Sequence, residues 1–135
     1  MTTIPFNSET DLAPILFLER RLVLARKMKD GGLPWHPHVG CFVWDVQGKI
    51  QLDSPFPNQV YFILSLPRFL DIFDSREKMQ EKLIWVPTWH QARLLCRNFG
   101  IPDNAIAELW QGNTIKEPGD ETCALYELLI NAMKG

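Results

Sequence analysis

The first residues that could do chemistry are the two histidines of the segment Trp-His-Pro-His, His36 and His38. In an extended chain, residues two apart point to the same side, so these two imidazoles could share a metal ion such as zinc. A third ligand could come from His90, Asp45 or Cys41, and no spacing in the sequence decides among them. The alternative is that the histidines are ordinary hydrogen-bonding groups of a surface loop, because H-x-H alone is a weak motif.

A second candidate site lies on one helix face. His90, Arg93 and Arg97 stand at positions i, i+3 and i+7 of a helix expected to begin after Thr88, so they share a face. Positive side chains near a helix N-terminus favour anions, which predicts a site for a small acidic ligand. The alternative is the solvated side of an amphipathic helix whose opposite side is core.

This helix is the first of a helix-turn-helix-like pair expected over residues 89–111. Thr88 and Gln91 form a capping box, and Gly100 is expected to take a positive φ and end the helix, leaving Asp103 to cap the next one. The pair resembles the DNA-reading unit of a transcriptional regulator. Its second helix carries no basic residue, however, and the whole chain has a net charge of −2. Both features argue against a nucleic-acid partner.

The remaining elements follow from periodicity and from turn residues. A first helix is expected over 11–29, capped by Ser8 or Thr10 and stopped by two glycines. Two strands, 39–46 and 49–52, are expected to form a hairpin around Gln47-Gly48. A strand over 59–64 has apolar residues on both faces, which predicts a central position in a sheet covered on both sides.

A helix is then expected from Ser65, with a break at Asp74-Ser75. The helical link of roughly 18 residues to a strand at 83–86 favours a parallel crossover. A last helix, apolar on one stripe, is expected from Asp120. We therefore predict an α+β fold: a mixed sheet of about four strands flanked by helices, with the helix pair 89–111 and a C-terminal helix.

Composition limits the class of protein. The 135 residues fit one globular domain, residues 1–135, with 46% apolar and 22% charged residues. The three cysteines, Cys41, Cys96 and Cys123, form no C-x-x-C pair, which is typical of reduced thiols in a cytoplasmic protein. We expect no secretory leader and no membrane span, because no apolar stretch approaches the roughly 20 residues that a span needs.

The motif VGCFVWDVQGKI resembles the opening hairpin of a Nudix hydrolase. That family's chemistry depends on a glutamate-rich metal-binding box, and residues 76–82 lack its glycines and paired glutamates, so the resemblance assigns neither family nor activity. No nucleophile elbow, phosphate loop, dinucleotide fingerprint or zinc-protease motif is present, and no cofactor is expected.

We therefore expect a cytoplasmic, non-enzymatic domain that binds another protein or forms a symmetric dimer. The expected interface is the first or the last helix, together with some of the five tryptophans. Two alternatives remain open. One is a helix-turn-helix regulator, and the other is a small hydrolase or metal-binding protein that uses His36, His38 and His90.

Overall fold

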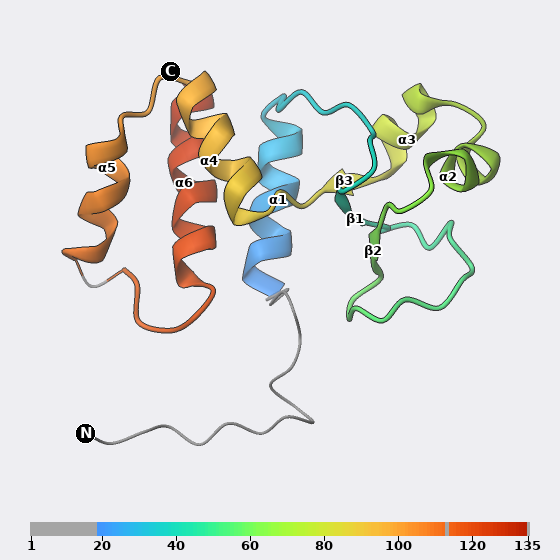
Figure 1. The fold of residues 1–135 in the computed structure, drawn as a ribbon, viewed down its shortest axis with the longest axis horizontal. Helices are drawn as coiled ribbons and strands as arrows, with labels where there is room; N and C mark the ends of the chain where they lie inside the picture. The colour runs from blue at the N-terminus through green and yellow to red at the C-terminus, as the bar shows by residue number, and fades with distance from the viewer. Residues whose placement is uncertain (1–18, 113, 135) are drawn as a thin grey trace.

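A computed structural model describes residues 19–112 and 114–134 of the chain (Figure 1). Its helices and strands are α1 (Glu19–Asp30), β1 (Phe42–Trp44), β2 (Val60–Phe62), α2 (Leu66–Phe73), α3 (Arg76–Lys82), β3 (Ile84–Trp85), α4 (Trp89–Asn98), α5 (Asp103–Ala107), a 3₁₀ turn (Glu108–Trp110) and α6 (Asp120–Lys134). The predicted beginning of the first helix, with its caps Ser8 and Thr10, lies outside the described residues.

The described strands form one antiparallel sheet in the order β2-β1-β3. Val43 in β1 lies opposite Tyr61 of β2 on one side and opposite Trp85 of β3 on the other. The predicted α+β class is confirmed. The predicted mixed sheet of about four strands is corrected to three antiparallel strands within the described part of the chain.

Helices cover both faces of the sheet (Figure 1). On one face, Phe42 and Ile84 pack in a hydrophobic cluster with α1, α4 and α6. On the other face, Val43 packs in a second cluster with Phe73 of α2 and Met79 of α3. Because successive residues of a strand point to opposite faces, a sheet buried on both sides needs apolar residues at every position.

The strand over residues 59–64 was predicted to lie in the centre of the sheet. This prediction is wrong, because among the described strands β1 is central and β2 lies at the edge. The apolar pattern correctly indicated a sheet covered on both faces, but an edge strand of such a sheet shows the same pattern. The predicted parallel crossover is confirmed. β2 and β3 run in the same direction and are joined through α2 and α3, while β1 lies between them and pairs with both.

The predicted hairpin between 39–46 and 49–52 is replaced by a turn built on Asp45. This side chain is fully buried, and its two carboxylate oxygens accept hydrogen bonds from the backbone N–H groups of Lys49 at 3.1 Å and Ile50 at 2.7 Å. These N–H groups are therefore bound to a side chain, not to a neighbouring strand. Residues 49–52 are not a strand, and β1 pairs with β2 instead.

Several predicted helix boundaries are confirmed. Ser75 begins α3, and its hydroxyl accepts a hydrogen bond from Lys78 N, so the helix breaks where it was predicted to break. Both bonds of the capping box between Thr88 and Gln91 are present at the start of α4. Gly100 has a φ of +75°, a left-handed conformation that glycine adopts without strain. Each boundary depends on neighbouring residues alone.

Helix α6 packs against α1 and α4 in the group of three helices on one face of the sheet. Its Leu125, Tyr126 and Leu129 are fully buried. Buried Arg21 of α1 donates from Nε to Tyr126 Oη at 3.2 Å and from Nη2 to the carbonyl oxygen of Pro87 at 2.7 Å, which joins α1, α6 and the approach to α4.

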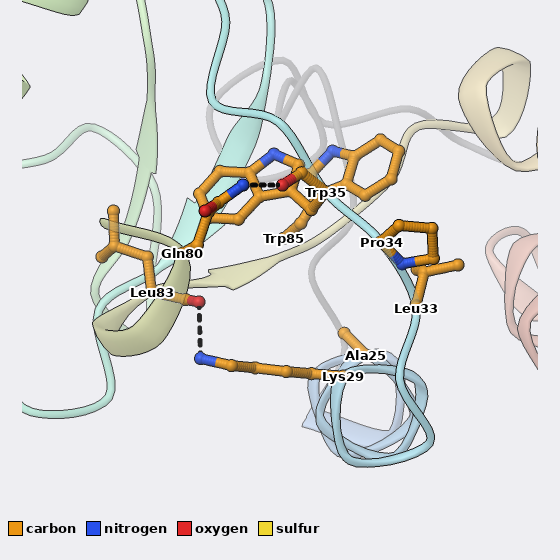
Figure 2. A pocket seen from close by; sticks show the side chains of 8 residues that line it. All are labelled: Ala25, Lys29, Leu33, Pro34, Trp35, Gln80, Leu83 and Trp85. Atoms are coloured by element: carbon orange, nitrogen blue, oxygen red, sulfur yellow. Dashed lines mark hydrogen bonds between the residues drawn. The ribbon is translucent and has the colours of Figure 1, made fainter. Parts of the chain in front are cut away.

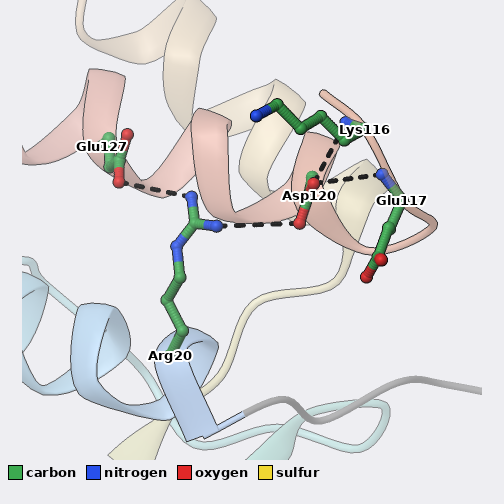
Figure 3. A network of polar contacts seen from close by, with 5 residues as sticks. All are labelled: Arg20, Lys116, Glu117, Asp120 and Glu127. Carbon is green, nitrogen blue, oxygen red and sulfur yellow. Dashed lines mark hydrogen bonds and ion pairs between the residues drawn. The ribbon is translucent and has the colours of Figure 1, made fainter. Parts of the chain in front are cut away.

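An exposed network reinforces this packing (Figure 3). Arg20 of α1 lies between Asp120 at 3.6 Å and Glu127 at 3.5 Å, both on α6. Asp120 also accepts backbone hydrogen bonds from Lys116 and Glu117, and these bonds are the main cause of the lowered pKa of its carboxyl. The apolar stripe of the last helix is therefore buried against α1 and α4, and ion pairs at its margin hold the same helices together.

Candidate functional site

The predicted ligand-binding residues do lie together on α4. His90, Arg93 and Arg97 line a shallow hollow of about 220 Å³ with Trp89 and Leu94. The predicted shared face is therefore present, and its chemistry is cationic with an aromatic edge.

An acidic residue balances part of this charge. Asp103, at the start of α5, lies 3.4 Å from Arg93 Nη2 and 3.8 Å from Arg97 Nη2. A second nitrogen of Arg93, Nη1, is shielded from solvent and has no hydrogen-bond partner. The face therefore holds two guanidinium groups against one carboxylate, an arrangement that favours a small anion.

The helix-turn-helix-like pair differs from the prediction in its packing. Cys96 and Ile106 are buried, whereas Phe99 is 37% exposed. The second helix, α5, spans only Asp103–Ala107. The predicted cap Asp103 is wrong, because Pro102 is the N-cap and Asp103 is the first helical residue, which the two arginines of α4 hold. The side chains best suited to contact phosphates thus face an acidic residue of the same pair.

The structure does not bring His36, His38 and His90 into one metal-binding group. Over residues 19–112 and 114–134, no cluster of three or more His, Cys, Asp or Glu side chains is placed to hold a metal ion. His38 Nδ1 lies 2.8 Å from the carbonyl oxygen of His36 and 3.1 Å from Cys41 Sγ. Among the predicted ligands, the side chains of His38 and Cys41 are therefore in contact, and His38 also contacts the backbone of His36.

The His38–Cys41 contact does not have the features of a nucleophilic pair. Cys41 is fully buried, and burial raises the pKa of its thiol. A reactive cysteine needs the opposite, a lowered pKa and access to solvent, because the thiolate is the nucleophile. The contact is a packing contact, in which the buried Cys41 thiol supports the loop that contains His36 and His38.

A cavity of about 250 Å³ lies beside Lys29 and the indoles of Trp35 and Trp85 (Figure 2). Lys29 Nζ donates to the carbonyl oxygens of Glu81 at 2.6 Å and Leu83 at 2.9 Å. Burial lowers the pKa of this ammonium group, but both hydrogen bonds require its protons. Lys29 thus binds the C-terminal carbonyls of α3, where a cation is favourable, and anchors α1 to that helix.

An exposed, mainly apolar hollow lies next to the edge strand, and we call it the β2 groove. It has a volume of about 370 Å³. Its lining residues are Ile50, residues 52–56, Tyr61, Phe62, Leu64, Ser65, and Arg68, Phe69 and Ile72 of α2. Leu64 is 75% exposed, Leu52 53% and Ile72 37%. Three large aliphatic side chains thus meet solvent around one concavity.

The free edge of β2 opens into this groove. Ile63 N donates to Cys41 O at 2.9 Å and Gln59 O accepts from Asp45 N at 3.0 Å, so the odd-numbered residues bond to β1. The backbone groups of Val60 and Phe62 therefore face away from β1, because the ladder alternates. At Val60 both backbone groups are already bonded: the Ser54 hydroxyl donates to the carbonyl oxygen of Val60, and the N–H of Val60 donates to the carbonyl oxygen of Pro57. Within the described part of the chain, the outward-facing backbone N–H and C=O of Phe62 have no partner and are open to another chain.

Sequence reasoning missed the β2 groove because it placed 59–64 in the middle of the sheet. Ser65 and Pro67 begin a helix immediately after Leu64, which marks the end of the strand but not its place in the sheet. The partial cover by residues 50–56 depends on Tyr61 Oη, which donates to Leu52 O at 2.6 Å, and no sequence pattern reveals that contact.

Among the described residues, no helix combines the length and the apolar character needed to cross a membrane. In comparisons with protein-family models, with curated proteins and with solved structures, no match to this chain was found.

Proposed function

We propose that this chain is a non-enzymatic protein-binding domain whose binding surface is the β2 groove. The observation that carries the proposal is the meeting of exposed aliphatic side chains, led by Leu64, with the free strand edge at Phe62. Apolar surface in water costs about 25 cal/mol per Å², and concave apolar patches on soluble proteins commonly mark interaction sites.

The groove favours an extended polypeptide as its ligand. A strand edge binds a partner by main-chain hydrogen bonds, and neighbouring pockets select the side chains that point toward them. At the β2 groove, Phe62 offers one N–H and one C=O, while Leu52, Leu64 and Ile72 offer apolar contacts. A segment with Leu, Ile or Phe at alternate positions matches this chemistry.

Binding is proposed in place of catalysis because the nucleophile candidates are occupied. The Cys41 thiol is buried with a raised pKa, and the Lys29 ammonium group donates to two carbonyl oxygens. The groove itself contains two serines, Ser54 and Ser65, but no histidine or cysteine that could act as a base beside them.

The test uses short synthetic peptides with Leu or Phe at alternate positions and NMR titration of the full chain. We expect micromolar binding that shifts the amide signals of Phe62 and Leu64. Leu64→Asp should weaken it at least about tenfold, since it replaces the most exposed apolar side chain of the groove with a carboxylate that the bound peptide would have to desolvate. The matched control is Val23→Asp on α1, an exposed apolar residue that does not line the groove. Equal binding by both variants, or shifts elsewhere, would contradict the proposal.

A second candidate function is the binding of a small anion by the hollow that His90, Arg93 and Arg97 line, which we call the α4 face. The observation that favours it is Arg93 Nη1, which is shielded from solvent without a hydrogen-bond partner while Nη2 contacts Asp103. A carboxylate or phosphate beside Arg93, Arg97 and His90 would satisfy that donor. This site and the β2 groove lie on different elements and can function independently.

A further inference from the structure

We infer that the occupant of the β2 groove is a second copy of this chain, which forms a two-fold symmetric dimer through the groove. This inference rests on the proposed function and identifies the polypeptide that the groove binds. It differs from the interface expected from the sequence, because the apolar stripe of α6 is buried against α1 and α4.

The charges around the groove point to a self-complementary partner. Lys49, Asp53, Arg68 and Asp71 line the groove and its outer margin, and none of them forms an ion pair with a described residue. Two are positive and two are negative. A strongly acidic or strongly basic partner would meet repulsion at half of these side chains, whereas a second copy brings both signs in equal number.

Two-fold symmetry places the opposite charges together. When two edge strands pair antiparallel, the two-fold axis is perpendicular to the sheet, so each face meets its own equivalent. Helix α2 packs on one face of the sheet, so both copies of α2 then lie on the same face of the paired sheets. Arg68 and Asp71 are both exposed and one helical turn apart. In the proposed dimer, Arg68 of each copy pairs with Asp71 of the other, which gives two equivalent ion pairs.

The same arrangement covers the exposed apolar surface. Leu64, the most exposed large apolar side chain of the described residues, lies at the end of β2 beside the free edge at Phe62. Ile72 lies one turn beyond Arg68 on α2. Pairing would remove both from water and give the N–H and C=O of Phe62 hydrogen-bond partners. Because the free edge is short, the dimer is expected to dissociate reversibly.

Sedimentation velocity of the full chain tests the inference, from about 1 μM to about 100 μM, where an interface near or below roughly 1,200 Å² dissociates. We expect a monomer–dimer equilibrium for the natural sequence. Leu64→Asp should weaken dimerisation at least about tenfold. Val23→Asp on α1 should leave it unchanged.

A charge exchange tests the register. Arg68→Asp gives α2 two negative side chains and Asp71→Arg gives it two positive ones, so each variant alone should dimerise at least about tenfold more weakly than the natural chain. An equimolar mixture of the two should form a heterodimer with nearly natural affinity, because every acidic side chain then faces a basic one. Unchanged circular dichroism spectra would show that both variants fold.

Two results would overturn the dimer. One is a natural chain that sediments as a monomer at every concentration, and the other is a mixture of the two charge variants that stays monomeric. The proposed function is judged separately by the peptide titration. A monomeric chain that still binds peptides at Phe62 and Leu64 would refute only the dimer, whereas a monomer that binds no peptide would refute both.

Discussion

At the scale of single residues, the surroundings of Arg93 indicate a ligand-binding site. Arg93 Nη1 is shielded from water and has no hydrogen-bond partner among the described residues, and the side chain lines a hollow with His90 and Arg97. Buried donors in proteins are nearly always paired, and a hydrogen bond to a charged group contributes about 1.5–3 kcal/mol. An anion in the hollow would pair this donor.

We therefore predict that citrate or inorganic phosphate binds the α4 face and that Arg93→Gln weakens this binding at least about tenfold. Isothermal titration calorimetry at constant ionic strength measures the effect. Lys27→Gln on α1 is the control, because it removes the same charge from an exposed position on another helix. If both variants lose affinity equally, the effect is general electrostatics and the site is refuted.

At the scale of the element, two serines at helix N-termini differ in one respect. Ser75 precedes α3 and its hydroxyl accepts a hydrogen bond from Lys78 N at 3.2 Å, whereas Ser65 precedes α2 and makes no such bond. Both have extended backbone conformations, so the side-chain bond is the main difference between them.

Ser75→Ala should lower the free energy of unfolding by about 1 kcal/mol, because one N–H at the start of α3 loses its acceptor. Ser65→Ala should cost less than about half of that, since no capping bond is lost. Urea denaturation followed by circular dichroism compares the two variants under the same conditions. Equal losses would show that the helix ends are held by packing and not by the Ser75 hydroxyl.

At the scale of the whole molecule, α6 is the helix that both α1 and α4 pack against on one face of the sheet. Leu129 is fully buried in the cluster shared by α1, α4 and α6, whereas Leu128, the next residue, is only half-buried. The cluster on the opposite face of the sheet is formed by α2 and α3 and does not include α6.

Leu129→Ala should therefore lower the free energy of unfolding by about 3 kcal/mol, through lost burial and the cavity left between three helices. Leu128→Ala removes the same atoms from a position where water already reaches the side chain, and should cost less than about half as much. Thermal or urea unfolding checks both. A larger loss for Leu128 would mean that α6 is rotated relative to the described packing.

The sequence by itself determined the features that depend on neighbours along the chain. The capping box at Thr88 and Gln91, the helix break at Ser75 and the positive φ of Gly100 all follow from hydrogen bonds or steric limits within a few residues. The α+β class followed from the same local signals, and so did the common face of His90, Arg93 and Arg97, because helical periodicity fixes which side chains are neighbours.

Only the tertiary structure decided which strands are neighbours and which surface stays open. A run of apolar residues on both faces is the same for a central and an edge strand of a sheet covered on both faces, so the edge position of β2 was not predictable from its apolar residues. The fully buried Asp45 carboxylate diverts the N–H groups of Lys49 and Ile50 from a hairpin, and Asp103 reaches back to Arg93. The β2 groove exists because contacts between distant segments leave Leu64 and the free edge at Phe62 uncovered, and such contacts have no signature in local sequence.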